Sequence, residues 1–352
     1  MDYDIIIIGL GPSGATLARL LPASFRVCAI DKKSLDGDDF KKPCGGLLAP
    51  DAQKFFARLD LTLPKDVLVD PQIFSVRAID MDSMRTRYYQ RFYMNLDRDK
   101  FDKWLISLIP PTVTVEHGCC TGISRIGGGF SVRYRQADGD LRQITTHYIV
   151  GADGAGSMVR RNFFHGHGIR RYTAIQQWFE EANATPFYSS VFDSHATDCY
   201  SWSLSKDGKF IFGGAYPPQN CRERFDAQKE ALLKHGFDFG QPLKTEACVV
   251  FRPSRYSDFR TAKTGAFLIG EAAGFISPSS LEGISYAMKS GYILSEAFQK
   301  CPKHPEQLYH KKVLGIKLNL MLKLVKCPFM YNRHLRKLIM KSGVTAIDML
   351  KP

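Results

Sequence analysis

One short glycine-rich segment near the start of the chain has the residue types and spacing to hold a nucleotide. Residues 9–14 read Gly9-Leu10-Gly11-Pro12-Ser13-Gly14, a G-x-G-x-x-G pattern between an apolar run and a segment with helical spacing. In such a turn the glycines allow a tight bend, a close approach of the backbone to a pyrophosphate, and close packing of helix on strand. The amides and dipole at the helix start favour the phosphate charge. The pattern predicts a dinucleotide site without separating FAD from NAD.

An acidic residue lies at the spacing that such a turn requires. Asp31 ends a second apolar run, twenty residues beyond Gly11, and Lys32 follows it. A carboxylate at the end of the second strand of a βαβ unit accepts hydrogen bonds from the adenosine ribose. We therefore expect Asp31 and Lys32 to contact the cofactor together with the turn.

Two further segments distinguish FAD from NAD. The first, Gly151-Ala-Asp153-Gly154-Ala-Gly-Ser-Met-Val-Arg160, is a DGxxSxxR pattern, and the second is Gly270-Glu271-Ala-Ala-Gly274. In this order the three motifs resemble the FAD-dependent para-hydroxybenzoate hydroxylase superfamily. The resemblance implies that the third motif holds the ribityl chain of FAD and that the following helix start faces the flavin ring. It places these residues at the cofactor: Asp153, Gly154, Gly270, Glu271, Gly274, Gly283 and Ile284.

The third motif departs from the family at one position. Glu271 stands where the family usually has Asp. Glutamate is one methylene longer and still offers a carboxylate acceptor. We expect it to bind the ribityl hydroxyls in a slightly shifted geometry.

Within that superfamily the chain resembles the geranylgeranyl reductase branch, in particular a small bacterial group of geranylgeranyl-reductase-like oxidoreductases. Pro43-Cys44-Gly45-Gly46 is similar to the branch's PCGG segment, which lies near the flavin ring. Residues 200–206, Tyr-Ser-Trp-Ser-Leu-Ser-Lys, are similar to its YxWxFPK segment, with Leu204 and Ser205 in place of Phe and Pro. The resemblance implies cofactor contacts for Cys44, Gly45, Gly46 and Arg98, and a substrate pocket lined by Tyr200 and Trp202.

These residues suggest a reaction, and other readings stay open beside it. The leading expectation is an FAD-dependent oxidoreductase that reduces a carbon–carbon double bond of a hydrophobic, isoprenoid or lipid-like substrate, with NAD(P)H as a candidate reductant. Cys44 would donate the proton while reduced flavin supplies the hydride, or it is only a small residue that fits a tight loop. The alternatives are an aromatic monooxygenase of the same fold and a non-catalytic FAD-binding membrane-surface protein.

Apolar periodicity predicts the elements that position these motifs. Residues 4–8 and 25–30 read as buried strands flanking a helix over 12–21, a βαβ unit. Residues 170–258 read as aromatic and strand-like, and 306–341 as two basic amphipathic helices broken near Pro328. Further expected elements are strands at 73–79, 86–95, 113–150 and 267–270, hairpin turns at 127–129 and 138–139, helices at 98–108 and 280–299, and a loop over 36–50.

The pattern predicts an α/β fold, α+β overall: a Rossmann-like FAD-binding domain with a parallel sheet, an inserted, largely antiparallel β-sheet substrate domain, and C-terminal helices. The expected boundaries are 1–70, 96–168 and 259–300 for the discontinuous FAD-binding domain, 71–95 and 169–258 for the substrate-binding domain, and 301–352 for the basic helical segment.

The net charge of +13 is concentrated at the end of the chain, where residues 303–352 hold eleven Lys or Arg and two acids. The apolar residues of this tail are expected to cap the FAD domain: Leu314, Ile316, Leu318, Leu320, Met321, Leu322 and Leu324. Its cations either form a solvated helix face or contact anionic lipid headgroups as a peripheral membrane surface. No nucleic-acid-binding fold accompanies the charge, so we do not expect a nucleic acid partner.

The cysteines and the hydropathy pattern indicate a cytoplasmic protein. The nine cysteines are odd in number and form no CxxC pair, which argues against a disulfide framework or a zinc site and favours a reducing compartment. His165-Gly-His167 lacks the further ligands of a metal site. No apolar stretch reaches the length of a membrane-spanning helix. The sequence does not indicate an oligomeric state.

Overall fold

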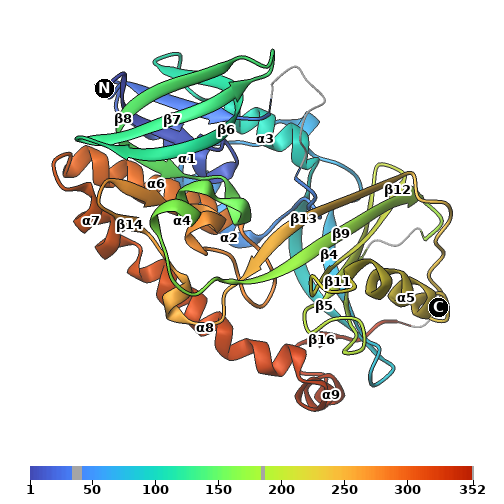
Figure 1. Ribbon diagram of the computed structural model, residues 1–352. Helices are drawn as coiled ribbons and strands as arrows, with labels where there is room; N and C mark the ends of the chain where they lie inside the picture. Colours follow the sequence, from blue (N-terminus) through green and yellow to red (C-terminus); the bar gives the residue numbers. More distant parts are fainter. Residues whose placement is uncertain (34–41, 184–186, 351–352) are drawn as a thin grey trace. The chain divides into compact units, whose positions relative to one another are not determined.

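The computed structural model describes residues 1–33, 42–183 and 187–350, so residues 36–41 of the predicted loop lie outside the described part. The chain forms two compact units, each assembled from three separate segments (Figure 1). The first unit consists of Met1–Lys41, Asp99–Arg170 and Phe251–Leu322, and the second of Lys42–Arg98, Arg171–Val250 and Lys323–Pro352. The assignment of cofactor and substrate domains stays a prediction.

The first unit is built on a parallel sheet with the strand order of a dinucleotide-binding fold. Strand β1 (Tyr3–Ile8) lies parallel to β2 (Val27–Asp31) on one side and to β8 (Leu141–Gly151) on the other. β6 (Val113–Ile126) pairs in parallel with β2, and β15 (Ala266–Leu268) with β8. Residues from Ile5 to Ile8 are buried, as expected for a strand covered on both faces.

A meander extends this sheet. The end of β6 turns into β7 (Gly129–Gln136), which pairs antiparallel with both β6 and β8, while β14 (Ala262–Lys263) pairs antiparallel with β15. The hairpin turns predicted at 127–129 and 138–139 are confirmed, because the chain reverses at both places.

Two helices of the first unit pack closely against each other. Helix α1 (Pro12–Leu20) follows β1, and α6 (Ile284–Lys300) lies beside it (Figure 1). A Cβ on Gly291 would lie 2.5 Å from Ser13 O, so this contact requires glycine.

Other helices of the chain are α2 (Pro50–Arg58), α3 (Arg98–Ser107), α4 (Met158–Phe163) and α7 (Pro305–Lys312), with 3₁₀ turns η1 (Lys65–Val67), η2 (Gly154–Gly156), η3 (Tyr256–Asp258) and η4 (Gly270–Ala273).

The second unit is a large, mostly antiparallel sheet, and its β10–β4 pair is parallel. Along the sheet the strands are β13 (Lys244–Arg252), β9 (Arg170–Glu180), β12 (Lys209–Tyr216), β11 (Ser201–Lys206), β10 (Tyr188–Phe192), β4 (Ile73–Asp80), β5 (Arg85–Asn95) and β16 (Ala346–Ile347), with β3 (Leu47–Leu48) also on β5. The predicted fold class is confirmed: a parallel-sheet unit joined to a largely antiparallel one.

One helix in the second unit was missed. The segment 170–258 was expected to be strand-like, yet α5 (Cys221–Leu233) lies within it. Phe225 and Leu232, seven residues apart, are fully buried in the same core cluster as Phe210 and Phe212 of β12. This tertiary packing of aromatic residues, rather than local strand propensity, fixes the helix.

The C-terminal helices differ from the prediction at two points. Residues 306–341 form three helices and not the two predicted, because α7 ends before Val313. The later break lies at Asn332, between α8 (Leu314–Tyr331) and α9 (Arg333–Ser342), and not near Pro328, which lies inside α8. Pro328 cannot donate the usual helical hydrogen bond to the carbonyl of Leu324, yet the helix continues past it to Tyr331. The Asn332 side chain then accepts hydrogen bonds from the first amides of α9.

The second difference concerns which residues of α8 are buried. Ile316 and Leu320 are buried as expected, but Leu314, Leu318 and Leu322 are exposed, so the prediction that they cap the domain was wrong. Apolar residues occur all around this helix, and the sequence does not show which side faces the protein. Among the described residues, none of the helices combines the length and the apolar character needed to cross a bilayer.

Candidate functional site

The three glycine motifs follow the carboxyl ends of neighbouring parallel strands in the first unit. Ile8, the last residue of β1, pairs with Gly151 of β8, and Gly151 pairs with Leu268 of β15. Ala152 N donates to Ile8 O at 2.8 Å, which joins the first two motifs. Open α/β sheets bind their ligands at this edge.

In the turn between β1 and α1, two glycines are tightly packed against neighbouring backbone, and a third glycine faces empty space. Gly9 has φ +98°, and its Cβ would lie 2.8 Å from Ala152 O, while a Cβ on Gly14 would lie 1.9 Å from Gly9 O. A Cβ on Gly11 would meet nothing within 4 Å. Gly11 also precedes α1 without a side-chain cap, and Pro12 is the first helical residue. The turn therefore has open space beside uncapped amides, which suits a pyrophosphate.

Asp31 is buried at the end of β2 and supports the same turn. Its carboxylate accepts a hydrogen bond from Leu10 N, and Oδ1 accepts one from Lys33 N at 2.7 Å. Lys32 O lies 3.1 Å from His117 Nε2, which fixes the backbone just after β2. A carboxylate accepts several hydrogen bonds at once, so these contacts leave Asp31 compatible with its predicted ribose contact.

Asp153 has a buried oxygen without a partner among the residues that the structure describes. Its Oδ2 accepts a hydrogen bond from Met158 N at 2.7 Å, but Oδ1 is buried and unsatisfied. Burial raises the pKa of this carboxyl group. A buried acceptor without a partner costs stability, so Asp153 fits a site that a hydrogen-bond donor of a ligand completes.

The remaining residues of the second motif connect it to the third. Ser157 Oγ accepts a hydrogen bond from Arg160 N and caps α4. The Arg160 guanidinium donates to Ala272 O at 2.8 Å and to Asp258 O at 2.9 Å. In this chain the Ser and Arg of the DGxxSxxR pattern thus supply a helix cap and hydrogen bonds that hold the Gly270–Gly274 turn.

The third motif packs on the start of α1. Gly270 has φ +57°, and its Cβ would lie 2.8 Å from Ser13 Oγ. Glu271 Oε1 accepts a hydrogen bond from Phe251 N at 2.9 Å. The Glu271 carboxylate therefore holds the end of β13. Further along, Gly274 has φ +86°, and Gly283 and Ile284 form the start of α6.

Two groups of predicted site residues emerge, one in each unit. The first unit holds Gly9, Gly11, Pro12, Ser13, Gly14, Asp31, Lys32, Asp153, Gly154, Gly270, Glu271, Gly274, Gly283 and Ile284. The second unit holds Cys44, Gly45, Gly46, Arg98, Tyr200 and Trp202. Arg98 is the first residue of α3, as expected. Their contacts with a cofactor or substrate stay predictions.

In the second unit a buried lysine, which sequence reasoning missed, lies beside the Cys44 loop. Lys206 is 5% exposed, and its Nζ donates to Leu96 O at 2.5 Å and to Gly46 O at 3.5 Å. Gly46 has φ +61°, and its N–H donates to Cys44 Sγ at 3.4 Å. Burial lowers the pKa of Lys206 to about 8, with nearby Cys44 the largest of the opposing influences. The only sequence signal was its place in the YxW segment.

Aromatic side chains surround the start of β11. The Tyr200 and Trp202 rings lie side by side with centroids 5.8 Å apart, and both are largely buried. Tyr188 OH donates to Tyr200 OH at 3.4 Å, and Trp202 Nε1 donates to Gln176 Oε1 at 3.3 Å. Burial raises the pKa of both tyrosines, so both remain neutral phenols. The cluster is apolar with a few fixed donors, as in sites for hydrophobic ligands.

The fold is similar to solved structures of flavin-dependent enzymes. A geranylgeranyl bacteriochlorophyll reductase-like protein from Thermoplasma acidophilum superposes with a TM-score of 0.74 at 19% identity, covering 98% of this chain and 88% of that chain. A probable FAD-dependent monooxygenase from Pseudomonas aeruginosa, PqsL, gives 0.70 at 15% identity, with 96% and 99% covered. The chain therefore has the fold of an FAD-dependent oxidoreductase.

Sequence comparison is more specific. No family model matches the chain. It is 52% identical over 351 residues to protein CbrA of Escherichia coli strain K12, covering 99% of each protein. The chain belongs to the CbrA family, which confirms the resemblance to the bacterial group that includes CbrA.

Proposed function

We propose that this protein binds FAD at the carboxyl edge of the parallel sheet in its first unit and acts as an FAD-dependent oxidoreductase. One observation carries the proposal. The open space at Gly11, the uncapped start of α1 and the unsatisfied Asp153 Oδ1 all belong to loops at that edge. A pyrophosphate would take the space and the amides. Asp31 and Lys32 would bind the adenosine end of FAD. Asp153 and Glu271 would accept hydrogen bonds from other hydroxyl groups of FAD.

We further propose that the reaction is reduction of a carbon–carbon double bond in a hydrophobic substrate. When bound and reduced, FAD supplies a hydride for such a reaction. The chain must then deliver one proton to the other carbon, and Cys44 is the proposed donor. The Gly46 N–H and the Lys206 ammonium lie close enough to stabilise the negative charge left on its sulfur. An external reductant, NAD(P)H in our proposal, would restore the two electrons.

The substrate would be recognised mainly by apolar contact. Tyr200 and Trp202 present flat faces with few polar atoms, and Tyr188 keeps a neutral hydroxyl beside them. An isoprenoid or other lipid-like chain suits such a surface.

An aromatic monooxygenase remains the second candidate because PqsL, named as a probable monooxygenase, shares the fold.

The experiment that separates the reductase from the monooxygenase uses purified protein with FAD. Anaerobic reduction of the flavin by NADH or NADPH is followed by addition of ligands extracted from the protein and identified by mass spectrometry. Reoxidation of the flavin without oxygen, with formation of a product two hydrogens heavier, is the expected result.

Other results decide against this proposal. Reoxidation that requires oxygen and yields a product one oxygen heavier would establish the monooxygenase instead. A protein that binds FAD but accepts electrons from no donor would fit a non-catalytic FAD-binding protein. Failure to bind FAD at all would refute the cofactor assignment itself.

A further inference from the structure

The helix α8 exposes a continuous apolar stripe. Leu314, Leu318, Leu322, Val325 and Phe329 are each between 48% and 63% exposed. Their spacing of 4, 4, 3 and 4 residues places all five within an arc of about 80° at 100° per residue. Figure 1 draws α8 as one continuous helix that leads into α9. The stripe therefore runs along nearly the whole length of the helix.

A buried lysine next to the stripe makes this exposure unusual. Lys317 is only 8% exposed, and its ammonium lies 5.3 Å from the centre of the Tyr256 ring. Burial lowers the pKa of Lys317. The helix thus buries a lysine while it exposes leucines, the reverse of an ordinary surface helix. Packing of the folded chain does not account for the leucines, and a contiguous exposed apolar surface of this kind marks a contact with something else.

The charge around the stripe selects among the possible occupants. Residues 307–347 contain nine Lys or Arg and no Asp or Glu. Arg336 and Lys317 are buried, whereas Lys326 on α8 and Lys337 and Lys341 on α9 are exposed. A second copy of the chain would bring cations against cations across the contact. An anionic surface matches both the charge and the apolar stripe.

We propose that α8 is an interfacial helix that lies in the plane of an anionic bilayer surface, with Leu318, Leu322 and Val325 inserted among the lipids. The 18-residue helix is about 27 Å long. Its stripe would enter the acyl boundary while the lysines of α8 and α9 contact headgroup phosphates. Leu338 and Ile339 of α9 are exposed as well. The proposal does not depend on the flavin chemistry.

The test is co-sedimentation of the full chain with lipid vesicles. Vesicles of phosphatidylcholine alone are compared with vesicles that contain equal amounts of phosphatidylcholine and phosphatidylglycerol. The double variant Leu318→Ser/Leu322→Ser is expected to weaken binding to the anionic vesicles at least about tenfold, since each leucine loses apolar insertion. Lys326→Gln is expected to weaken binding about fivefold at low salt and to have little effect near 1 M salt, where charges are screened.

Matched controls separate the surface from general effects. Leu141 on β8 is 65% exposed and Leu243 is 53% exposed, so Leu141→Ser/Leu243→Ser removes two equally exposed leucines elsewhere and should bind like wild type. All variants should keep the wild-type melting temperature and FAD content.

Three results would overturn the proposal. One is wild-type protein that does not sediment with anionic vesicles, and another is a Leu318→Ser/Leu322→Ser variant that binds as well as wild type. The third is a wild-type dimer that this variant converts to monomer in size-exclusion chromatography, which would assign the stripe to a second copy of the chain.

Discussion

Lys206 is a buried lysine of the second unit whose pKa is strongly lowered. Its ammonium is satisfied by two backbone carbonyls and not by a carboxylate within ion-pair distance in the described contacts. The folded protein binds its proton with a pKa of about 8, against 10.5 for an ordinary lysine. Between these values the unfolded chain holds more protons than the folded one, so the free energy of unfolding rises with pH across this window.

A lysine-to-methionine variant tests this linkage. Wild-type protein should gain about 2–3 kcal/mol in free energy of unfolding between pH 7.5 and pH 10 from this group, because one pKa unit corresponds to about 1.4 kcal/mol. Lys206→Met should lack that gain when urea unfolding is measured at both pH values. Lys209→Met, at the exposed end of the same hairpin, is the control and should keep the wild-type slope. Equal slopes in all three proteins would mean that Lys206 is not buried as described.

Cys44 gives a second prediction at this scale. If its thiol donates the proton, Cys44→Ser should lower kcat about 10²-fold or more, the usual contribution of a general acid. FAD content should stay within twofold of wild type, because Ser preserves the size of the side chain in the loop. Single-turnover reoxidation of reduced flavin by substrate measures the step directly. Unchanged turnover would leave Cys44 as a small residue that fits the Gly45–Gly46 turn.

At the scale of elements, the turn between β1 and α1 separates two kinds of glycine. Gly14→Ala places a Cβ 1.9 Å from Gly9 O, so the chain must shift, and we expect a loss of about 1–3 kcal/mol in the stability of the FAD-free protein. Gly11→Ala meets nothing within 4 Å and should change that stability by less than about 1 kcal/mol. It should nevertheless reduce FAD affinity at least about tenfold.

The two measurements for this pair are urea unfolding of the FAD-free proteins and titration with FAD followed by flavin fluorescence. Equal FAD affinity in wild type and Gly11→Ala would contradict the placement of the pyrophosphate beside Gly11. A stable Gly14→Ala variant would instead show that the helix can move away from the strand.

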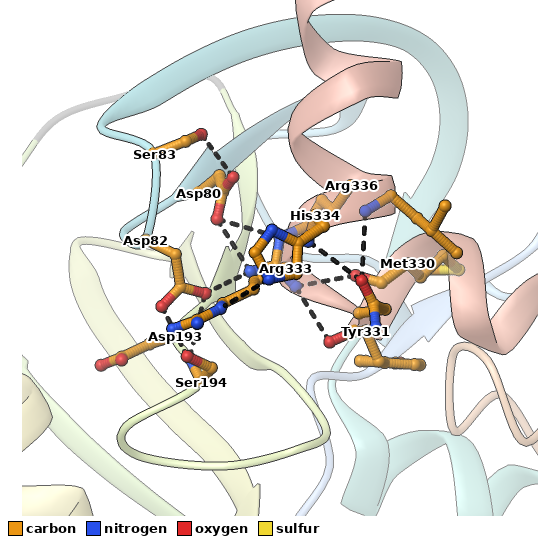
Figure 2. Close-up of polar contacts among 12 residues, drawn as sticks. Asp80, Asp82, Ser83, Asp193, Ser194, Met330, Tyr331, Arg333, His334 and Arg336 are labelled. Carbon is orange, nitrogen blue, oxygen red and sulfur yellow. Dashed lines mark hydrogen bonds and ion pairs between the residues drawn. The ribbon is translucent and has the colours of Figure 1, made fainter.

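The attachment of α9 gives another prediction for an element. Arg336, 4% exposed, donates through Nε to Asp80 Oδ1 at 2.9 Å and also contacts Asp82 (Figure 2). Its NH1 donates to Met330 O at 3.0 Å, so one guanidinium joins α9, the end of α8 and the β4–β5 turn. Ser194 Oγ donates to Asp82 Oδ1 at 2.6 Å and completes the cluster.

Removing the cation alone should be costly. Arg336→Met leaves two carboxylates buried without their partner, and we expect a loss of about 3–5 kcal/mol in the free energy of unfolding. The triple variant Arg336→Met/Asp80→Asn/Asp82→Asn removes the unpaired charges as well and should recover part of that loss. Urea unfolding measures both, and faster proteolysis after Tyr331 should report release of α9. A single variant as stable as wild type would show that the cluster is not buried in solution.

The sequence predicted best those elements whose signals come from neighbouring residues. The strand before Gly9, the helix that begins at Pro12 and the acid at Asp31 could be predicted from adjacent residues, because each signal depends on its immediate neighbours. The contacts of Lys206 could not, since its partners Leu96 and Gly46 are 110 and 160 residues away in sequence. Contacts of this kind depend on how distant parts of the chain pack together, which the pattern of neighbouring residues does not show.

The same limit explains the errors near the end of the chain. Apolar residues occupy every side of α8, so periodicity could not tell the buried Leu320 from the exposed Leu318. For α5, aromatic content favoured strands, whereas burial of Phe225 against the sheet selected a helix. Asp80 and Arg336 are 256 residues apart, and neither residue alone indicates an ion pair.

At the scale of the whole molecule, the chain passes repeatedly between its two units, and neither unit is a continuous piece of sequence. A cut at any one of these passages divides at least one unit between the two pieces. The β16 strand shows the consequence: Ala346 pairs with Tyr89 and Ile347 with Tyr88, so residues near the C-terminus complete the sheet edge formed by β5. We therefore treat ligand effects on stability as a property of the intact chain.

Removal of FAD is the prediction that belongs to this scale. A ligand that binds only the folded state stabilises it by about 2.7 kcal/mol at a free concentration one hundred times Kd, which for a chain of 352 residues corresponds to a rise of about 4 °C in Tm. Stripping the flavin should lower Tm by that amount, and FAD should restore it.

FMN is the informative control in this experiment because it lacks the adenosine diphosphate half of FAD. The Gly9–Gly14 turn and Asp31 are proposed to hold that half, so FMN should restore little of the lost stability. Full restoration by FMN would mean that binding depends on the flavin end alone. The carboxyl edge of the parallel sheet would then not be the main cofactor site, and the loops around Cys44 and Trp202 would have to hold the flavin without it.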